Sequence, residues 1–251
     1  MVRLKTGVFI GLLTAAAWLP LGCPRQIAAG RQQSYSSDMQ LEAKRSPADF
    51  LPDGNLSKRS WQHAKSVEFD RDASGTSRYP EISTHIASLW TETHIYFVFW
   101  GHYDSLNVYE GEDAAIERWQ LWDRDVVEVF LNPQPERVNH YYEFELAPNN
   151  QWVDLEIDKT KEPFNDVSWN SGFEHATRID EKNRTWTAEM RIPLSPMNVG
   201  AIHPGAEWRA NFFRAAGKGD DRHRKFLAWS VIPEGGTFHV PARFGILKIV
   251  N

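Results

Sequence analysis

Apolar and polar side chains alternate along short segments of the chain, and turn residues separate these segments. In residues 185–192 apolar side chains occupy every second position from Trp186 to Ile192, and polar side chains fill the positions between them. A period of two residues is typical of a β-strand with one buried face. Helical periodicity nowhere exceeds about three turns. The pattern therefore predicts an all-β fold.

A series of segments rich in β-branched and aromatic residues lies between turn signals such as Asn132-Pro133. Because these short strands follow one another closely, the pattern favours an antiparallel β-sandwich, with jelly-roll or immunoglobulin-like layering, over an α/β sheet. The length of 251 residues fits one such domain. The predicted strands are 82–89, 94–102, 125–131, 140–146, 151–158, 173–179, 185–192, 207–214, 226–230 and 244–250.

The chain begins with the pattern of an export signal. Arg3 and Lys5 provide a short positive start, and residues 7–21 form an uncharged, largely apolar run that is too short to span a bilayer comfortably. We therefore exclude residues 1–23 from the fold. We expect an exported bacterial protein that is periplasmic, anchored to the outer membrane or extracellular.

Cys23 is the only cysteine and lies at the end of this run. The sequence Leu-Gly-Cys at 21–23 resembles the lipobox of bacterial lipoproteins, in which the cysteine is acylated and tethers the protein to the membrane; a plain signal peptide is the alternative. Residues 24–46 are rich in Gln, Ser, Arg and Ala without an apolar period, which predicts a flexible linker. Residues 47–251 then form one domain, whose core must hold it together without a disulfide.

Composition and charge narrow the function classes. Hydrophobic residues make up 41% and charged residues 24% of the chain, as in an ordinary soluble protein. A net charge of −5 without a basic stripe provides no attraction for nucleic acid or an anionic membrane surface. The eleven tryptophans are unusual, and an indole ring suits the apolar face of a sugar as well as a protein core.

Several motifs follow one another in the order of a known family. They include DGNL at 53–56, DVVEVF at 125–130 and PARFG at 241–245, with further matches at 87–98, 141–144, 188–193, 208–211 and 228–230. Together they resemble the family 9 carbohydrate-binding modules and their family 9-like relatives. The resemblance implies a β-sandwich that grips the end of a sugar chain between two aromatic side chains, with hydrogen bonds from nearby polar groups.

The resemblance also places the aromatic pair. In the family a clamp tryptophan precedes the glutamate of the central strand by six residues, which is the position of Trp122 relative to Glu128. Trp119 is a rival for this role, and covering the edge of the sandwich is the alternative role for Trp122. The partner position falls on Phe238, where well-studied members carry Trp. Phe can stack on a sugar with less area, or it can anchor its loop.

Polar candidates accompany this pair. A carboxylate among apolar residues, such as Glu128, needs a partner. Sugar hydroxyls could serve, and the alternative is an ion pair with Arg209 or Arg214 inside the sandwich. Asn211 could bind hydroxyls, although such a residue often satisfies backbone groups instead. The full set of predicted sugar ligands is Trp122, Phe238, Glu128, Trp119, Asn211, Arg214, His239 and Glu143.

The acidic residues depart from the family pattern and raise an enzymatic alternative. The family's sugar-contacting arginine falls on the strand at 141–146, where this chain has Glu143 and Glu145. A glycoside hydrolase needs two carboxylates across the scissile bond, and Glu128, Glu143, Glu145 and Asp154 could supply a pair. Among 33 acidic residues some pair is expected in any fold. We therefore predict binding without cleavage, with separate glycoside hydrolases as candidate partners.

Electron transfer is the third function class. Related sandwiches hold b-type haem through Met and His ligands. Met190 is the candidate, but it shares its face with Trp186 and Ile192 and is expected in the core. No zinc or iron spacing occurs. No cofactor is predicted apart from a structural calcium ion, for which the loop with Asp220 and Asp221 offers ligands.

Overall fold

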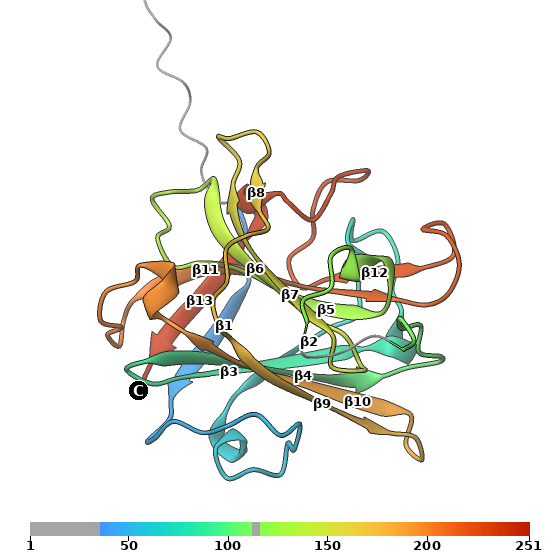
Figure 1. Ribbon diagram of the computed structural model, residues 1–251, viewed down its shortest axis with the longest axis horizontal. Helices are drawn as coiled ribbons and strands as arrows, with labels where there is room; N and C mark the ends of the chain where they lie inside the picture. The colour runs from blue at the N-terminus through green and yellow to red at the C-terminus, as the bar shows by residue number, and fades with distance from the viewer. Residues whose placement is uncertain (1–35, 112–115) are drawn as a thin grey trace, which may run out of the picture. The chain divides into compact units, whose positions relative to one another are not determined.

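The computed structural model describes residues 36–111 and 116–251 (Figure 1). The predicted export signal, Cys23 and residues 24–35 of the predicted linker lie outside the described residues. Within the described part no helix has the length and apolar character needed to cross a membrane.

The strands are β1 (Gln40–Arg45), β2 (Ser66–Phe69), β3 (Thr84–Trp90), β4 (His94–His102), β5 (Val126–Asn132), β6 (His140–Leu146), β7 (Trp152–Asp158), β8 (Asn165–Asp166), β9 (Glu174–Asp180), β10 (Thr185–Pro193), β11 (Glu207–Ala216), β12 (Lys225–Ala228) and β13 (Gly245–Val250). Short 3-10 helices are η1 (Trp61–His63), η2 (Pro80–Ile82), η3 (Leu121–Asp123), η4 (Ser195–Met197) and η5 (Pro241–Arg243).

These strands form one curled sheet whose halves make two layers. The order is β8-β7-β6-β5-β11-β13-β1-β3-β4-β10-β9, with β12 pairing with β11 and β2 pairing with β3. Strands β5, β6, β7 and β11 belong to one layer, and β3, β4, β9 and β10 belong to the other (Figure 1). The predicted all-β sandwich is confirmed.

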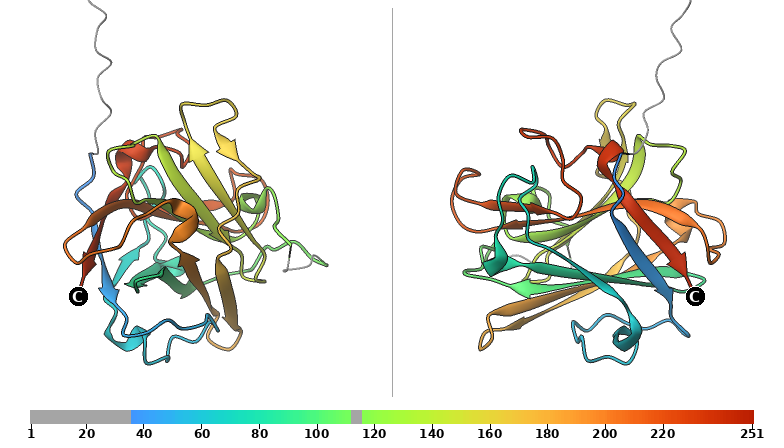
Figure 2. Two further views of the ribbon diagram at one scale, coloured as in Figure 1. Left: turned by 60° about the vertical axis from the view of Figure 1, so that its left-hand side comes forward. Right: turned by 180° about the vertical axis from the view of Figure 1, so that it is seen from behind.

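Strand β1 joins the two layers and corrects the sequence prediction twice. Residues 40–44 pair in parallel with β13, and residues 43–45 pair in parallel with β3; Figure 2 shows β1 and β13 side by side. The sheet is therefore mixed and not purely antiparallel. Residues 24–46 were predicted to be a flexible linker, but residues 40–45 form a strand in the middle of the sheet. Their backbone N–H and C=O groups can form the hydrogen bonds of a sheet whatever the side chains are.

The hydrophobic core lies between the layers. On β10 the apolar positions Trp186, Ala188, Met190 and Ile192 are at most 3% exposed and face this core. The opposite layer contributes apolar side chains such as Phe212 of β11. The predicted alternation is thus confirmed, and Met190 packs among apolar core residues as expected.

A buried ion pair covers the outer face of β10. Glu189 is fully buried, and its Oε1 lies 2.9 Å from Lys58 Nζ and accepts a hydrogen bond from Trp61 Nε1 (2.8 Å). The backbone N–H groups of Asp53 (2.8 Å) and Gly54 (2.9 Å) donate to Oε2. Gly54 has φ of +70°, a conformation that favours glycine. The Asp53-Gly54 turn near the start of the domain therefore donates two backbone hydrogen bonds to the buried carboxylate of Glu189.

Asp49 ties the segment after β1 to the turn between β3 and β4. Its carboxylate accepts hydrogen bonds from Thr91 Oγ1 (2.5 Å), Thr93 Oγ1 (2.8 Å) and the Tyr96 hydroxyl (3.0 Å). Burial acts to raise the pKa of Asp49, but these hydrogen bonds and the neighbouring His94 outweigh burial and hold the pKa at about 2. The folded state therefore favours the ionised carboxylate.

A chain that begins at residue 47 should not fold stably, whereas one that begins at residue 36 should. Removal of β1 unpairs the edges of β13 and β3 and opens the core beside Leu41 and Ala43, which are 2% and 0% exposed. Thermal unfolding followed by circular dichroism should show a cooperative transition for 36–251. For 47–251 we expect no transition, or a midpoint lower by more than about 10 °C. Equal midpoints would show that β1 is dispensable.

Asp49→Asn should lower the free energy of unfolding at pH 7 by about 1 kcal/mol, allowing for solvent screening of a side chain that is 38% exposed. Because the folded-state pKa lies below the unfolded value, the contribution is complete above about pH 5 and is lost as the pH falls toward 2. Urea unfolding of both proteins at pH 7 and pH 2.5 should give a gap that shrinks at the lower pH. A gap that does not change with pH would contradict this role.

Candidate functional site

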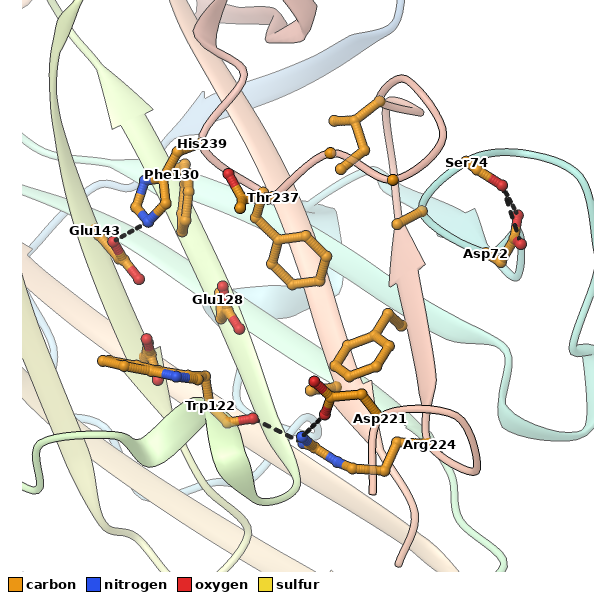
Figure 3. Close-up of a pocket in the computed structure, with 18 of the residues that line it drawn as sticks. Asp72, Ser74, Trp122, Glu128, Phe130, Glu143, Asp221, Arg224, Thr237 and His239 are labelled. Carbon is orange, nitrogen blue, oxygen red and sulfur yellow. Dashed lines mark hydrogen bonds and ion pairs between the residues drawn. The ribbon is translucent and has the colours of Figure 1, made fainter. Parts of the chain in front are cut away.

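A pocket of about 690 Å³ lies on the outer face of β5, β6 and β11 (Figure 3). Alternation along β5 directs Val127 and Val129 into the core, whereas Glu128 and Phe130 line the pocket. The floor is therefore the reverse side of the sheet that builds the core. Lining residues also come from the segments 72–79, 119–123, 164–165, 221–226 and 232–239.

Trp122 stands on η3, directly before β5, and lines the pocket. Its neighbour Leu121 is buried, and Arg224 Nη2 donates to the carbonyl oxygens of Trp122 and Arg124 at 2.7 Å each. Trp119 also lines the pocket, is 43% exposed, and meets Trp122 edge to face at a centroid distance of 4.7 Å. Both predicted tryptophans therefore belong to the same part of the pocket wall.

Phe238 lines the same pocket from the segment before η5. Its ring stacks on Phe213 at a centroid distance of 4.1 Å and an angle of 8°, and Phe226 meets it edge on at 6.1 Å. Phe238 remains partly exposed beside these two rings and contributes apolar surface to the pocket. The structure brings Phe238 and Trp122 into one pocket, while their closure on two sides of a sugar stays a prediction.

Three glutamates occupy the pocket floor. Glu128 of β5 and Glu145 of β6 stand opposite each other in the antiparallel register, and Glu143 lies two residues before Glu145 on the same face. All three line the pocket and are at most 3% exposed. One oxygen from each lies within 4.8 Å of the others. These are the side chains of the pocket that could hold a metal ion.

The floor carboxylates lack protein partners on several atoms. Within the described part of the chain, no N–H or hydroxyl group donates to Glu128 Oε1, Glu143 Oε2 or either oxygen of Glu145. Glu143 and Glu145 lie close enough to share a proton between their carboxyl groups. Arg209, a predicted ion partner of Glu128, stands opposite Asn132, four residues farther along β5. Burial and the neighbouring carboxylates raise the pKa of Glu128 and Glu145 well above the ordinary value. Burial raises the pKa of Glu143 to about 7.

Positive charge near the floor is scarce. Arg224 is the only Lys or Arg among the described lining residues, and it opposes the rise in the pKa of Glu128. His239 shares a hydrogen bond with the Tyr141 hydroxyl (Nδ1–O 2.8 Å), and its Nε2 lies 3.8 Å from Glu143 Oε2 (Figure 3). Burial lowers the pKa of His239 to about 4. The imidazole is therefore neutral at pH 7 and compensates none of the acidic charge.

Two predicted sugar ligands are used by the fold instead. Asn211 is fully buried, donates to the carbonyl oxygen of Ser230 (2.8 Å) and accepts from the N–H of Ser230 (2.9 Å), so it satisfies backbone groups. Arg214 lies on the core side of β11, where its Nη2 donates to the carbonyl oxygen of His102 (2.7 Å). Neither residue lines the pocket. The structure corrects both predictions, and it also corrects the predicted ion pair of Arg214 with Glu128.

Some lining residues were outside the sequence prediction. Arg224 and Thr237 reach the pocket from loops, and Phe226 reaches it from β12. No local motif marks residues that meet only in three dimensions. Glu145 did carry a signal, because it follows Glu143 by two residues on one strand and must share its face.

The predicted calcium loop is largely paired within itself. Asp220 accepts hydrogen bonds from Arg222 Nη2 (2.6 Å) and shares one with His223 Nδ1 (2.7 Å). Asp221 is exposed and lies 3.4 Å from Arg224 Nη1. Calcium binding by this loop stays a prediction.

Solved structures share the architecture. A family 9 carbohydrate-binding module from Caldicellulosiruptor kristjanssonii, in complex with cellotriose, superposes with a TM-score of 0.61 at 16% identity, over 85% of this chain and 94% of that chain. A protein of Bacteroides uniformis ATCC 8492, provisionally described as carbohydrate-binding, superposes with a TM-score of 0.69 at 19% identity, over 85% of this chain and 100% of that chain. At such identities the likeness shows the shared fold.

Sequence comparison identifies the family. A protein of Arthroderma benhamiae named "Extracellular protein" is 27% identical over 138 residues, which are 49% of this chain and 60% of that relative. The alignment thus spans less than two thirds of the relative's length. The profile described as "Carbohydrate family 9 binding domain-like" matches residues 52–251. Because this match covers most of the chain and confirms the resemblance drawn from the motifs, the chain belongs to the carbohydrate family 9 binding domain-like family.

Proposed function

We propose that the chain binds the end of a saccharide in the pocket over β5, β6 and β11, without cleaving it. The observation that carries this proposal is the combination of Trp122 on the wall with buried, unpartnered acceptor oxygens on the floor. A pyranose offers a complementary surface, because its CH groups face an aromatic ring and its hydroxyls donate hydrogen bonds. Family membership and the fold shared with a cellotriose-bound module support the same conclusion.

The pocket dimensions fit a terminal sugar. A volume of about 690 Å³ lies within the usual range for small-ligand sites, roughly 300–1,000 Å³. The exposed part of the Phe238 ring and the indole of Trp122 would provide apolar contact. Glu128 Oε1 would accept from a hydroxyl, which gives a buried carboxylate the partner that it lacks in the protein. Binding of this kind needs a preformed slot and no chemical step.

The placement of the carboxylates favours binding over hydrolysis. Glycosidases hold their two carboxyl groups on opposite sides of the scissile bond. Glu128, Glu143 and Glu145 instead lie together on adjacent strands of one sheet. A ligand resting on this floor would meet all three from the same side. Incubation with an oligosaccharide panel should release no reducing ends, and their release would overturn this part of the proposal.

Export and partners complete the proposed role. The relative in Arthroderma benhamiae carries the name "Extracellular protein", and the sequence begins with an export pattern that ends at Cys23. An exported binding domain, tethered through a lipidated Cys23, would capture saccharides at the outer face of a bacterial envelope. Separate glycoside hydrolases would supply or consume the bound chain ends.

Trp122→Ala should abolish saccharide binding or weaken it by about 10-fold or more, because the apolar platform is lost. The measurement is a glycan array followed by calorimetry with the best binder, with cellotriose included as a first probe. The thermal midpoint should fall by only a few degrees, since the ring lies at the pocket wall outside the core.

Trp119→Ala is the matched control for that variant. Its ring is more exposed and supports Trp122 edge on, so binding should weaken less. Full binding by the Trp122 variant, or a collapse of its thermal midpoint, would assign Trp122 to the architecture and not to the ligand.

A further inference from the structure

The three floor glutamates have the geometry of a cation site. Glu128, Glu143 and Glu145 offer one oxygen each, and these oxygens lie within 4.8 Å of one another. Oxygen ligands of one calcium ion lie about 2.3–2.6 Å from it, so two ligands on opposite sides are at most about 5 Å apart. The carboxylates can therefore reach one shared ion with little movement of the strands.

The burial of these carboxylates without N–H or hydroxyl donors is a second, separate sign that they bind a ligand. Glu128, Glu143 and Glu145 are 2%, 3% and 0% exposed, and four of their six oxygens receive no N–H or hydroxyl donor from the described residues. Buried polar groups in folded proteins are almost always paired, because an unpaired carboxylate is costly. All three side chains line the pocket, and Figure 3 shows Glu128 in the middle of it.

Charge balance selects a divalent ion. Burial raises the pKa of all three floor glutamates, and a bound cation would favour their ionised forms. Once ionised, the three carboxylates would face one guanidinium among the described lining residues, that of Arg224, whose charge acts on Glu128. Asp123, which acts on Glu145, is exposed to solvent. A monovalent ammonium group would leave one negative charge at the floor, whereas a divalent ion closes the balance. Burial of such a cluster is then reasonable, since low dielectric strengthens the attraction.

We propose that Glu128, Glu143 and Glu145 bind one Ca²⁺ at the floor of the pocket, and that hydroxyls of the saccharide fill the coordination positions that face outward. Calcium takes six to eight oxygen ligands, and three carboxylates supply between three and six. The remaining positions open toward the volume bounded by Trp122 and Phe238. The part of this inference that concerns the saccharide rests on the proposed function, whereas the ion site does not.

Calorimetry on the full chain tests the ion site first. Calcium chloride titrated at pH 7.5 into protein freed of metal with EDTA and desalted should bind one ion per chain, with a Kd of about 10⁻³ M or tighter. At 10 mM Ca²⁺ the thermal midpoint should rise by several degrees. Mg²⁺ should bind more weakly, because it demands a smaller octahedral site. Absence of both heat and shift would overturn the proposal, and equal binding of Mg²⁺ would overturn the assignment to calcium.

Two variants locate the ion. Glu145→Gln and Glu128→Gln keep the shape of the side chain and remove one ligand charge, so Ca²⁺ affinity should fall at least 10-fold. Because each substitution also removes a buried carboxyl group that lacks an N–H or hydroxyl donor among the described residues, the metal-free midpoint should not fall, which separates ligand loss from misfolding. Asp220→Asn is the matched control from the loop and should bind Ca²⁺ like the native chain. Loss of Ca²⁺ binding in that control with retention in the glutamate variants would move the site to the loop.

A glycan experiment separates the two parts of the inference. Saccharide binding is measured on the native chain in Ca²⁺ and in EDTA, and binding should be lost in EDTA. Binding that is equal in both buffers would overturn the link between ion and sugar. If Ca²⁺ binds as expected and no saccharide binds in either buffer, the proposed function fails while the ion site stands.

Discussion

Strand alternation on β5, β6 and β11 organises both the core and the pocket, because successive side chains of a strand point to opposite faces of the sheet. Val127 and Val129 face the core, and Glu128 between them must face the pocket. A shift of the pairing by one residue would carry acidic side chains into the core and valines into the pocket. The register of these strands therefore specifies the fold and the site together. A shifted register would expose core valines and bury acidic side chains in the core, and this loss of stability keeps the carboxylates in place.

The same period explains which strands could be predicted. Strand β10 carries clear alternation, and strands β3 to β7 are rich in β-branched and aromatic residues between turn residues, so the positions of these strands followed from the sequence. Strands β1 and β8 offer too few apolar residues for recognition: β8 contains two residues, and β1 alternates but buries only Leu41 and Ala43 in an otherwise polar segment. Strand β1 is held in the sheet by parallel backbone hydrogen bonds to β13 on one side and to β3 on the other. Any sequence without proline can form these hydrogen bonds. A prediction from side-chain pattern alone therefore assigns this strand to a linker.

The site was predicted where spacing along the chain fixes position, and was missed where only packing does. Trp122 precedes β5 by a fixed number of residues, so its place at the pocket followed from the motif. Arg214 follows Phe212 and Phe213, and two adjacent aromatic residues hide which face of β11 is the core. The predicted ligand was accordingly placed on the wrong face. Arg224 lies in a loop, where no period exists, and it reaches the pocket through tertiary structure alone.

Two sets of buried carboxylates, Glu189 and the three floor glutamates, differ in their partners, and this difference supports ligand binding at the pocket floor. Glu189, on the other layer, is as buried as the floor glutamates, but Lys58, Trp61 and two backbone N–H groups satisfy it. The fold thus supplies partners where a buried acid has only a structural task. Glu145 receives no N–H or hydroxyl donor from the described residues on either oxygen; its near neighbour is another acid, Glu143, and burial disfavours its charged form. Since chains can replace such a residue by an apolar one at no cost to packing, an unpartnered acid that faces a pocket is best explained by a partner that comes from outside the chain.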